Sequence, residues 1–537
     1  MSDAAPLKSL AVSALLIAAA VAFPPASGLA APLEANPDSA LSDALAAIEG
    51  APLALDDAIR SAIEHATEAR SAAASRGAAE GAVRRERGAF DPELFGEFSK
   101  SSDEAQSSTP FFGAPVLRKE EITTSAGARM QLPIGTELSA SLETIKETSN
   151  STFESFVPKY TTVGKIEVTQ PLLKGFGPAA RSALTSAERD LEAAVARFDD
   201  AVLAVRADTE RGYWDLYAAE RDFAVQQLIF DRASSLLKEA DLRVQAGLVG
   251  PIQVANARVF HAEQEQALLD REESLDAASD RLATLVGRRP ADGHARYRPI
   301  DDPPAEIAVE DEEALVARAF AGSRELAAAE KDAESARALE RGARWDALPS
   351  LDLFDSLGGN GLSGTSQVRT DSAGNVIPAP PSGGAGDAVS EAVGRDFPTW
   401  SAGVRLSMPI GLRADRGERA RLRAEAERAD QDAIAVRRSL EERVRAGRRE
   451  LVHAKRRLDA ARGGVAASRE QVRIGTLEYR AGRSTAFELV RLGADLATAQ
   501  QRYSQALVRT AKAAADLRRL TSDGLPPASA GSEGSTR

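Results

Sequence analysis

Apolar and small residues recur every three or four positions between residues 178 and 247. The seam includes Leu191, Val195, Phe198, Val202, Val205, Gly212, Leu216, Ala219, Phe223, Phe230, Ala233, Leu237, Ala240 and Val244. Residues 414 to 482 repeat this spacing with smaller residues and one interruption at Arg443. Such a sustained seam is typical of a coiled coil. At about 1.5 Å per residue, each predicted helix would span roughly 105 Å, which is too long for a single globular domain.

Four further helices are predicted, each about half as long, at residues 54 to 88, 250 to 287, 310 to 345 and 484 to 520. Two short helices stacked end to end would match the length of one long neighbour. We therefore expect the helices to form a uniform cylinder.

The chain is a duplication, with related halves at roughly residues 54 to 290 and 309 to 520. Each half runs through a helix, strands, a long helix, a sharp turn and a shorter helix. Residues 242 to 247 at the first sharp turn align with residues 477 to 482 at the second. Where strands give way to a long helix, Gln170-Pro171-Leu172 aligns with Met408-Pro409-Ile410. The pattern predicts two helical hairpins per chain.

Between residues 91 and 170 the hydrophobic period changes from 3.6 to 2, which indicates strands with one apolar and one polar face. Strands are predicted near residues 93–100, 121–132, 136–146 and 159–169, and in the second half near 350–357 and 399–408. Aromatic residues flank them at Phe156, Tyr160, Phe397 and Trp400. These features are typical of an outer-membrane β-barrel. A soluble β-sandwich alternates in the same way, but the duplication and the export signal described below favour the barrel.

The predicted strands are too few to close a lipid-facing barrel, because about eight is the working minimum and hydrocarbon does not tolerate open edges. Hence the barrel must be shared among protomers. The short turn at residues 133–136 would be periplasmic. The predicted long external loops are residues 101–120, 147–158 and 358–397.

The N-terminus carries Lys8, an apolar run from Leu10 to Phe23, and small residues at Gly28 and Ala30. This order predicts a cleaved secretory signal over residues 1–31, because the apolar run is too short for a transmembrane anchor. No later segment is long and apolar enough to be a membrane-spanning helix. The remaining segments are predicted to be linkers at residues 32–53 and 291–308 and a disordered tail at 521–537.

Composition removes several classes of function. The net charge of −13 disfavours nucleic-acid binding, and the absence of cysteine excludes disulfides, thiolate metal sites and lipid attachment at an N-terminal cysteine. The histidines lie at spacings that do not suit metal ligands: His65, His261, His294 and His453. Ser235 and Lys238 lie inside the coiled-coil seam without companion motifs, and Gly175-Phe176-Gly177 lacks the third glycine of a dinucleotide loop. We expect no catalytic residue, cofactor or metal, and no enzymatic activity.

Over about residues 52 to 520 the chain resembles the TolC-type outer membrane efflux protein family. The resemblance rests on residues 53–59 (LALDDAI) opening the first helix, residues 170–177 (QPLLKGFG) closing the strands, the glycine-marked helix tips, and their duplicated order. It implies a mainly α fold, with a homotrimeric α-barrel tunnel in the periplasm joined to a shared β-barrel in the outer-membrane lipid. It also implies docking on a periplasmic adaptor and an inner-membrane pump of the RND or ABC type.

The chain departs from the family's commonest pattern of two strands per half and twelve per trimer. The extra hairpin at residues 121–146 would give six strands per protomer and eighteen in all. Since its apolar face carries no charge, we expect the hairpin to join the barrel. The alternative is a hairpin packed outside the barrel or over its mouth.

In the family, the tips of the helical hairpins are the periplasmic entrance and the adaptor docking point. The resemblance places docking at Gly247, Leu248, Val249, Gly250, Gly482, Arg483, Ser484 and Thr485. Glycine suits a helix end that needs positive φ, and Ser484 or Thr485 is expected to cap the next helix. Charged residues near the tips are candidates for gating the entrance: Asp241, Arg243, Glu478, Arg480, Arg483 and Glu488. Simple turn chemistry and a solvated helix face are the alternative interpretations.

Two other functions remain open at this point. A periplasmic adaptor is also exported, but it should show one helical hairpin where this chain shows two. A structural coiled coil of the envelope would not conduct ions. The transported substrate is not specified by the sequence, because a wide water-filled duct needs little chemistry of its own.

Overall fold

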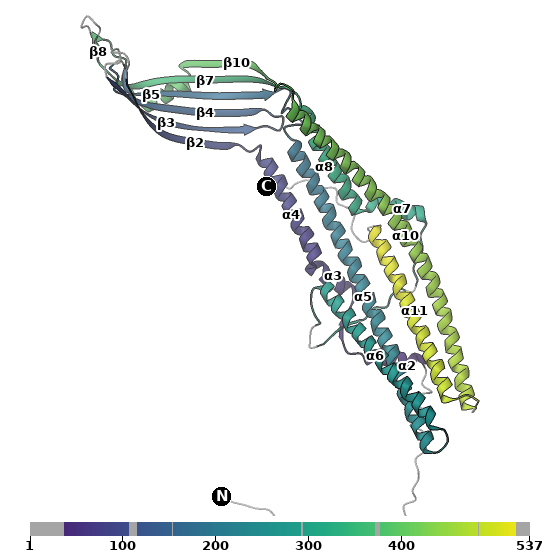
Figure 1. The fold of residues 1–537 in the computed structure, drawn as a ribbon. Helices are drawn as coiled ribbons and strands as arrows, with labels where there is room; N and C mark the ends of the chain where they lie inside the picture. The colour runs from purple at the N-terminus through teal and green to yellow at the C-terminus, as the bar shows by residue number, and fades with distance from the viewer. Residues whose placement is uncertain are drawn as a thin grey trace, which may run out of the picture.

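The computed structural model describes residues 37–106, 115–152, 154–290, 294–304, 306–370, 376–481 and 483–521. Within them, a long body of helices carries a β-sheet at one end (Figure 1). The predicted signal peptide and nearly all of the predicted tail lie outside these ranges. No helix that the structure describes has both the length and the apolar character needed to cross a bilayer.

Two long helices form the body, as predicted: α5 spans Ser182–Gln245 and α10 spans Arg413–Arg480. The helices α6 (Pro251–Val286) and α11 (Ala486–Leu520) pack back along them as antiparallel hairpins. The helices of each hairpin approach closely. A Cβ atom added to Gly212 of α5 would lie 2.8 Å from Leu285 Cδ1 of α6.

The first predicted short helix is broken in two. It forms α3 (Leu55–His65) and α4 (Thr67–Gly88), separated by Ala66 at ψ 132°. The end of α6 at Gly287 lies against His65, and α4 packs on α5 as α6 does. The helices α4 and α6 therefore follow one another along α5, as expected, and α3 contacts both α5 and α6.

The third predicted short helix is broken in the same way, into α7 (Glu312–Gly322) and α8 (Arg324–Asp346). Ser323 lies between them at ψ 120°, and its hydroxyl accepts a hydrogen bond from Leu326 N at 3.2 Å. The prediction of one continuous helix was wrong in both halves. Alanine is not a helix breaker, so the break at Ala66 depends on packing against the neighbouring helices, whereas Ser323 is a favourable N-cap that helps to start α8.

Both predicted linkers contain regular secondary structure, which packs against the middle of α5. Residues 32–53 include α2 (Pro37–Ala46) and β1 (Ala51–Leu53), and β1 pairs in parallel with β6 (Tyr297–Pro299). Tyr213 of α5 is fully buried beneath them, with Oη 2.9 Å from Leu53 O and 3.0 Å from Ile300 N. Three-residue strands leave no periodic signal, which explains why the sequence analysis missed them.

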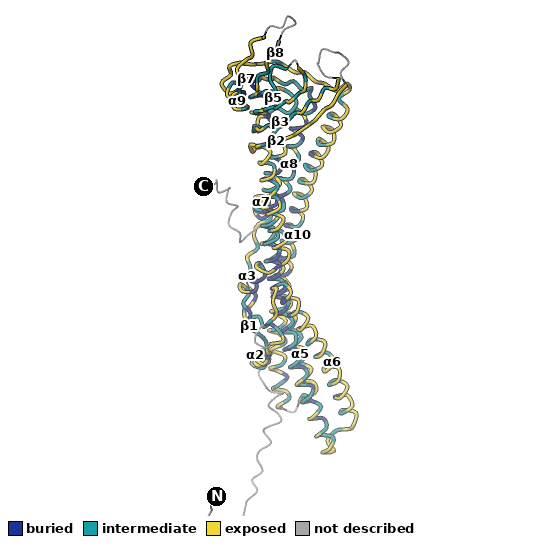
Figure 2. The backbone as a smooth tube through the Cα atoms, turned by 90° about the vertical axis from the view of Figure 1, so that its left-hand side faces the viewer, coloured by how far each residue is buried: buried dark blue, intermediate teal, exposed yellow. Residues whose placement is uncertain are grey.

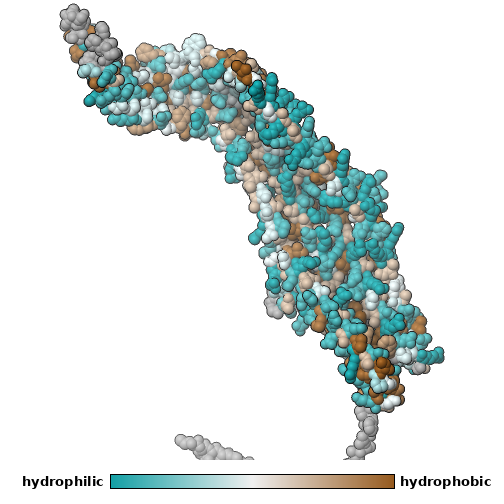
Figure 3. All heavy atoms as spheres, viewed as in Figure 1, coloured by the Kyte–Doolittle hydropathy of each residue, from teal (hydrophilic) through white to brown (hydrophobic). Residues whose placement is uncertain are grey.

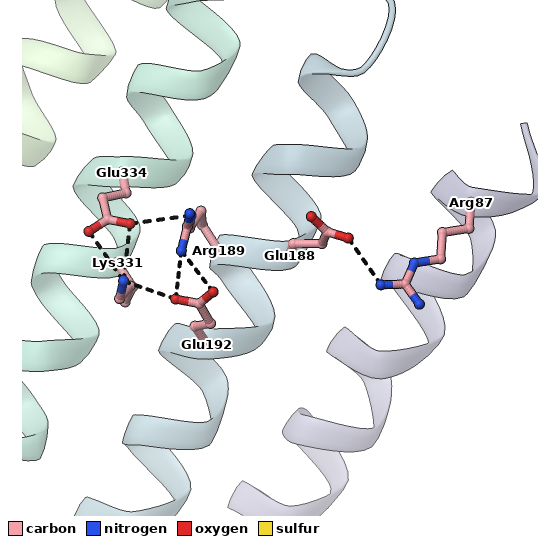
Figure 4. Close-up of polar contacts among 6 residues, drawn as sticks. All are labelled: Arg87, Glu188, Arg189, Glu192, Lys331 and Glu334. Carbon is pink, nitrogen blue, oxygen red and sulfur yellow. Dashed lines mark hydrogen bonds and ion pairs between the residues drawn. The ribbon is translucent and has the colours of Figure 1, made fainter. Parts of the chain in front are cut away.

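Alternating charges connect α5 and α8 in the upper body (Figure 4). Arg189 lies 2.8 Å from Glu192 and 3.2 Å from Glu334, and Lys331 lies 2.9 Å from Glu192 and 3.1 Å from Glu334. Burial opposes ionisation of Glu192, but hydrogen bonds from Lys331 and Arg189 hold its pKa below the ordinary value. The ring of charges links these two helices at the surface of the body.

All six predicted barrel strands belong to one antiparallel sheet, in the order β10-β7-β5-β4-β3-β2. The strands are β2 Glu93–Gln106, β3 Val116–Gln131, β4 Glu137–Ser149, β5 Phe156–Pro171, β7 Ser350–Ser366 and β10 Phe397–Ser407. The extra hairpin, β3 and β4, is hydrogen-bonded between β2 and β5. It is thus part of the sheet and not an appendage.

The strands run further outward than predicted, into all three expected loops. Ion pairs between strands extend the sheet where the apolar alternation stops, such as Lys100 with Glu120 at 3.4 Å and Lys119 with Glu147 at 3.2 Å. The third predicted loop contains the end of β7 together with β8 (Arg369–Thr370), β9 (Val376–Ile377) and α9 (Ala385–Gly394). Backbone hydrogen bonding between strands does not require an apolar face. Periodicity alone therefore predicted strands that are shorter than those observed.

One face of the sheet is mainly apolar, with Asp355 of β7 as a charged exception opposite Val168 and Ala402, and the other face is polar. Strand register places Ala128, Ala140, Ile166, Leu357 and Trp400 in one row across the apolar face. The exposed large residues of this face are Leu94, Phe98, Ile166, Leu353, Leu357, Trp400, Val404 and Leu406. Trp400 is 74% exposed and Leu94 is 83% exposed. A folded chain does not leave so many large side chains open to water without a partner or a lipid phase.

Candidate functional site

The two helical hairpins end in turns that share the same hydrogen bonding. In the first, Gly247 has φ 70° and Leu248 N donates to Arg243 O at 2.9 Å. In the second, Arg483 N donates to Glu478 O at 2.9 Å. Both are six-residue closures of the kind that commonly ends a helix at glycine. The predicted docking residue Gly482 lies outside the described residues.

The helices that follow the turns, α6 and α11, begin within two residues of the predicted positions. Pro251 occupies the first turn of α6, where its missing N–H is not needed. Thr485 Oγ1 accepts a hydrogen bond from Glu488 N at 3.2 Å, so Thr485 and not Ser484 caps α11. Ser484 Oγ donates to the Glu488 carboxylate at 3.1 Å. Glu488, a gating candidate, therefore takes part in the cap of its own helix.

Apolar side chains are exposed at both tips. Leu248 is 74% exposed, and the others are Leu242, Ile252, Leu477 and Phe487. In Figure 3 hydrophobic residues gather at the lower end of the body, below helices whose surface is largely hydrophilic. Val249 and Gly250 complete the first turn, and Val249 is half-buried. Exposed apolar residues at a helix tip are suited to contact with another protein.

A polar link joins the two hairpins just above the tips. Tyr479 of α10 points its hydroxyl to Glu239 Oε1 of α5 at 3.4 Å, and Arg243 lies 2.5 Å from the same oxygen. Burial, together with the Glu239 carboxylate, raises the pKa of Tyr479, so its hydroxyl keeps its proton and donates. Glu239 Oε2 is buried and has no hydrogen-bond partner among the residues that the structure describes.

Of the predicted gating residues, the structure brings only Arg243 into this link. Asp241 lies 3.9 Å from Arg258 of α6, and Glu478 and Arg480 are on the exposed side of α10. The sequence analysis missed Glu239 and Tyr479. One signal was available: in the repeat, Tyr479 stands where the first hairpin has Val244, so a hydroxyl replaces an apolar seam residue.

The family model for outer membrane efflux proteins matches residues 58–288 and 315–522, which is most of the chain. The chain belongs to the outer membrane efflux protein family. Its function is that of an outer-membrane efflux channel, as predicted, and its place is the outer membrane with a large periplasmic tunnel. The family is a transport duct, which argues against the alternatives of an adaptor and a structural coiled coil.

Solved structures with the same fold are outer-membrane channels. The efflux protein matches the OprN channel with a TM-score of 0.61 at 16% identity, over 91% of this chain and 93% of that one. It matches CmeC of Campylobacter jejuni with a TM-score of 0.59 at 13% identity, over 88% and 86% of the two chains. The open state of MtrE from Neisseria gonorrhoeae gives 0.58 at 17% identity, over 88% and 90%. No curated protein matches by sequence. These likenesses confirm the predicted fold class.

Proposed function

We propose that this efflux protein works as a homotrimer in which three sheets of six strands close into one barrel of eighteen strands. The observation that carries the proposal is the sheet with two open edges. The edge strands β2 and β10 are exposed along almost their whole length and carry apolar residues such as Leu94 and Val404. Open edges in hydrocarbon leave backbone groups unpaired at high cost, and pairing β10 with β2 of the next copy removes that cost.

The structure of the extra hairpin supports its place in the barrel wall. Residues 125–136 (SAGARMQLPIGT) resemble residues 401–412 (SAGVRLSMPIGL), and Gly135 and Gly411 both have φ 94°. On the polar face the Phe95 ring lies against Gly127, and the Arg129 guanidinium lies over that ring. In the second half the Phe354 ring lies against Gly403 in the same way, under Arg405. The end of β3 thus has the same local construction as the end of β10, a wall strand of the second half.

The width of the channel follows from the strand count. Barrel diameter grows roughly in proportion to the number of strands, and barrels of about 16–18 strands leave an aqueous channel. The polar face would line it, since charged residues such as Glu143, Lys165 and Glu167 lie there. The protein would act as a passive exit from the periplasm to the exterior.

The helix tips would dock a periplasmic adaptor that connects to an inner-membrane pump. The exposed Leu248, Ile252 and Phe487 support this role, because they leave apolar surface open at the hairpin tips. The link between Glu239 and Tyr479 would hold the entrance closed. Opening would separate α10 from α5 and break it.

Two measurements test the proposal. The chain has no cysteine, so Glu93→Cys combined with Ser407→Cys places unique thiols at the lower ends of the two edge strands. We expect oxidation to produce a covalent trimer, and each single variant to stay uncrosslinked. In planar bilayers the purified protein should give discrete openings. A protein that is monomeric in detergent and does not conduct would contradict the proposal.

A further inference from the structure

The helix α9 packs on the apolar face of the sheet and not on its polar face. Ala388 and Ala392 of α9 are 0% and 2% exposed, and Thr162 beneath them is fully buried. Thr162 belongs to the same face as Ile166, since it lies four residues before it on β5. Figure 2 shows α9 beside β7 and β5 at the end of the molecule farthest from the helix tips.

Two glycines of β7 leave the space that α9 occupies on the sheet. A Cβ atom at Gly359 would lie 2.2 Å from Ala392 O, and one at Gly361 would lie 1.8 Å from Ala388 O. Any side chain larger than hydrogen would push the helix off the sheet. Gly359 and Gly361 have the same strand parity as Leu357, so α9 packs on the apolar face. In the proposed barrel this face is the outside.

The helix covers the upper border of the apolar face. Going outward from the row of Ile166 and Leu357, the next rows pair Gly164 with Gly359 and Thr162 with Gly361. The row after these pairs Lys146 with Tyr160 and Tyr160 with Ser363. Apolar residues therefore give way to polar ones directly under α9, as at the interface between hydrocarbon and headgroups.

The exposed side of α9 carries one charged residue, Asp387, and is otherwise uncharged. Gly386, Ser390 and Val393 lie there, and Val393 is 67% exposed. The two acidic side chains of the helix are bonded to backbone amides. Asp387 Oδ2 accepts from Gly384 N at 2.7 Å, and Glu391 Oε2 accepts from Leu362 N at 3.0 Å. A mostly uncharged surface with a single carboxylate suits the interface between hydrocarbon and headgroups.

We propose that α9 is a lipid-contacting helix that lies on the outer wall of the barrel at the outer-leaflet border. The occupant of its exposed side is lipid, because that side continues the lipid-facing surface of Leu357 and Trp400. The inference rests on the proposed barrel, which makes the apolar face the outside.

The test uses single cysteines labelled with a fluorescent probe that reports its surroundings, in vesicles of phosphatidylethanolamine and phosphatidylglycerol. Val393→Cys reports on α9. Leu357→Cys is the control within the apolar face, and Glu104→Cys is the control at the outer end of β2, on the same face of the sheet. We expect brominated lipid to quench the probe at position 393 about as strongly as the probe at 357, and iodide to quench only the probe at 104.

Displacing α9 should reverse this result. In the Gly361→Leu background the probe at position 393 should become open to iodide, while the probe at 357 stays in lipid. Ala388→Asp offers a second route to the same displacement without altering a strand. Quenching of the 393 probe by iodide alone in the parent protein would overturn the inference, and so would protection from both quenchers, which would indicate burial against another subunit. Channel conductance measured on the same samples reports separately on the proposed function.

Discussion

Replacing Tyr479 by phenylalanine should release the entrance without altering the duct. The substitution removes only the hydroxyl that donates to Glu239 at 3.4 Å. A typical hydrogen bond contributes about 0.5–1.5 kcal/mol, and a long one belongs near the lower end, at about 0.7 kcal/mol. If the three copies open together, the closed state loses about 2 kcal/mol, which is roughly a 30-fold shift toward the open state.

Single-channel recording measures this shift as open probability. We expect Tyr479→Phe to open more often while the conductance of each open channel stays the same, because the tunnel wall keeps its shape. Tyr503→Phe is the matched control, since Tyr503 lies on α11 well away from the turns. Glu239→Gln, which keeps the size of the side chain but removes its charge, should also raise the open probability.

An unchanged open probability in both Tyr479→Phe and Glu239→Gln would refute the gate. An increase in Tyr503→Phe of the same size would refute it equally, because the effect would then not depend on the link between the hairpins.

The remaining predictions concern stability and are checked by thermal unfolding of the purified protein. Gly212→Val should destabilise by about 1–3 kcal/mol, because the new side chain would meet Leu285; Gly463→Ala, with nothing within 4 Å, should be neutral or stabilising by up to about 1 kcal/mol. Burial raises the pKa of Glu220 from 4.5 to about 7 against the pull of two arginines, so stability should fall as the pH rises through this interval and stay reduced above it. Glu220→Gln should therefore stabilise at pH 8, by at most about 3 kcal/mol, and do little near pH 4. The pKa of Glu192 is lowered, so its ionised form should stabilise the fold by about 0.5–1 kcal/mol at pH 7 and this stabilisation should be lost in acid. In Glu192→Gln the stability should no longer show this loss between pH 7 and acid.

Periodicity predicted the long helices, the hairpins and all six strands of the large sheet, because each repeats a local pattern. The two tips were also predictable, since Gly247 and Thr485 act through bonds to residues a few positions away. The link proposed to gate the entrance was not predictable. Tyr479 and Glu239 lie 240 residues apart, and neither shows by its own neighbours which helix it will face.

What the sequence determined by itself is therefore the set of elements and their duplicated order, because helix and strand patterns depend on spacing along the chain. Only the tertiary structure decided the break at Ala66, the pairing of β1 with β6 and the packing of α9 on Gly359 and Gly361. Each of these depends on the surface that a distant segment presents, and the free energy of that contact outweighs weak local preferences for helix, strand or loop.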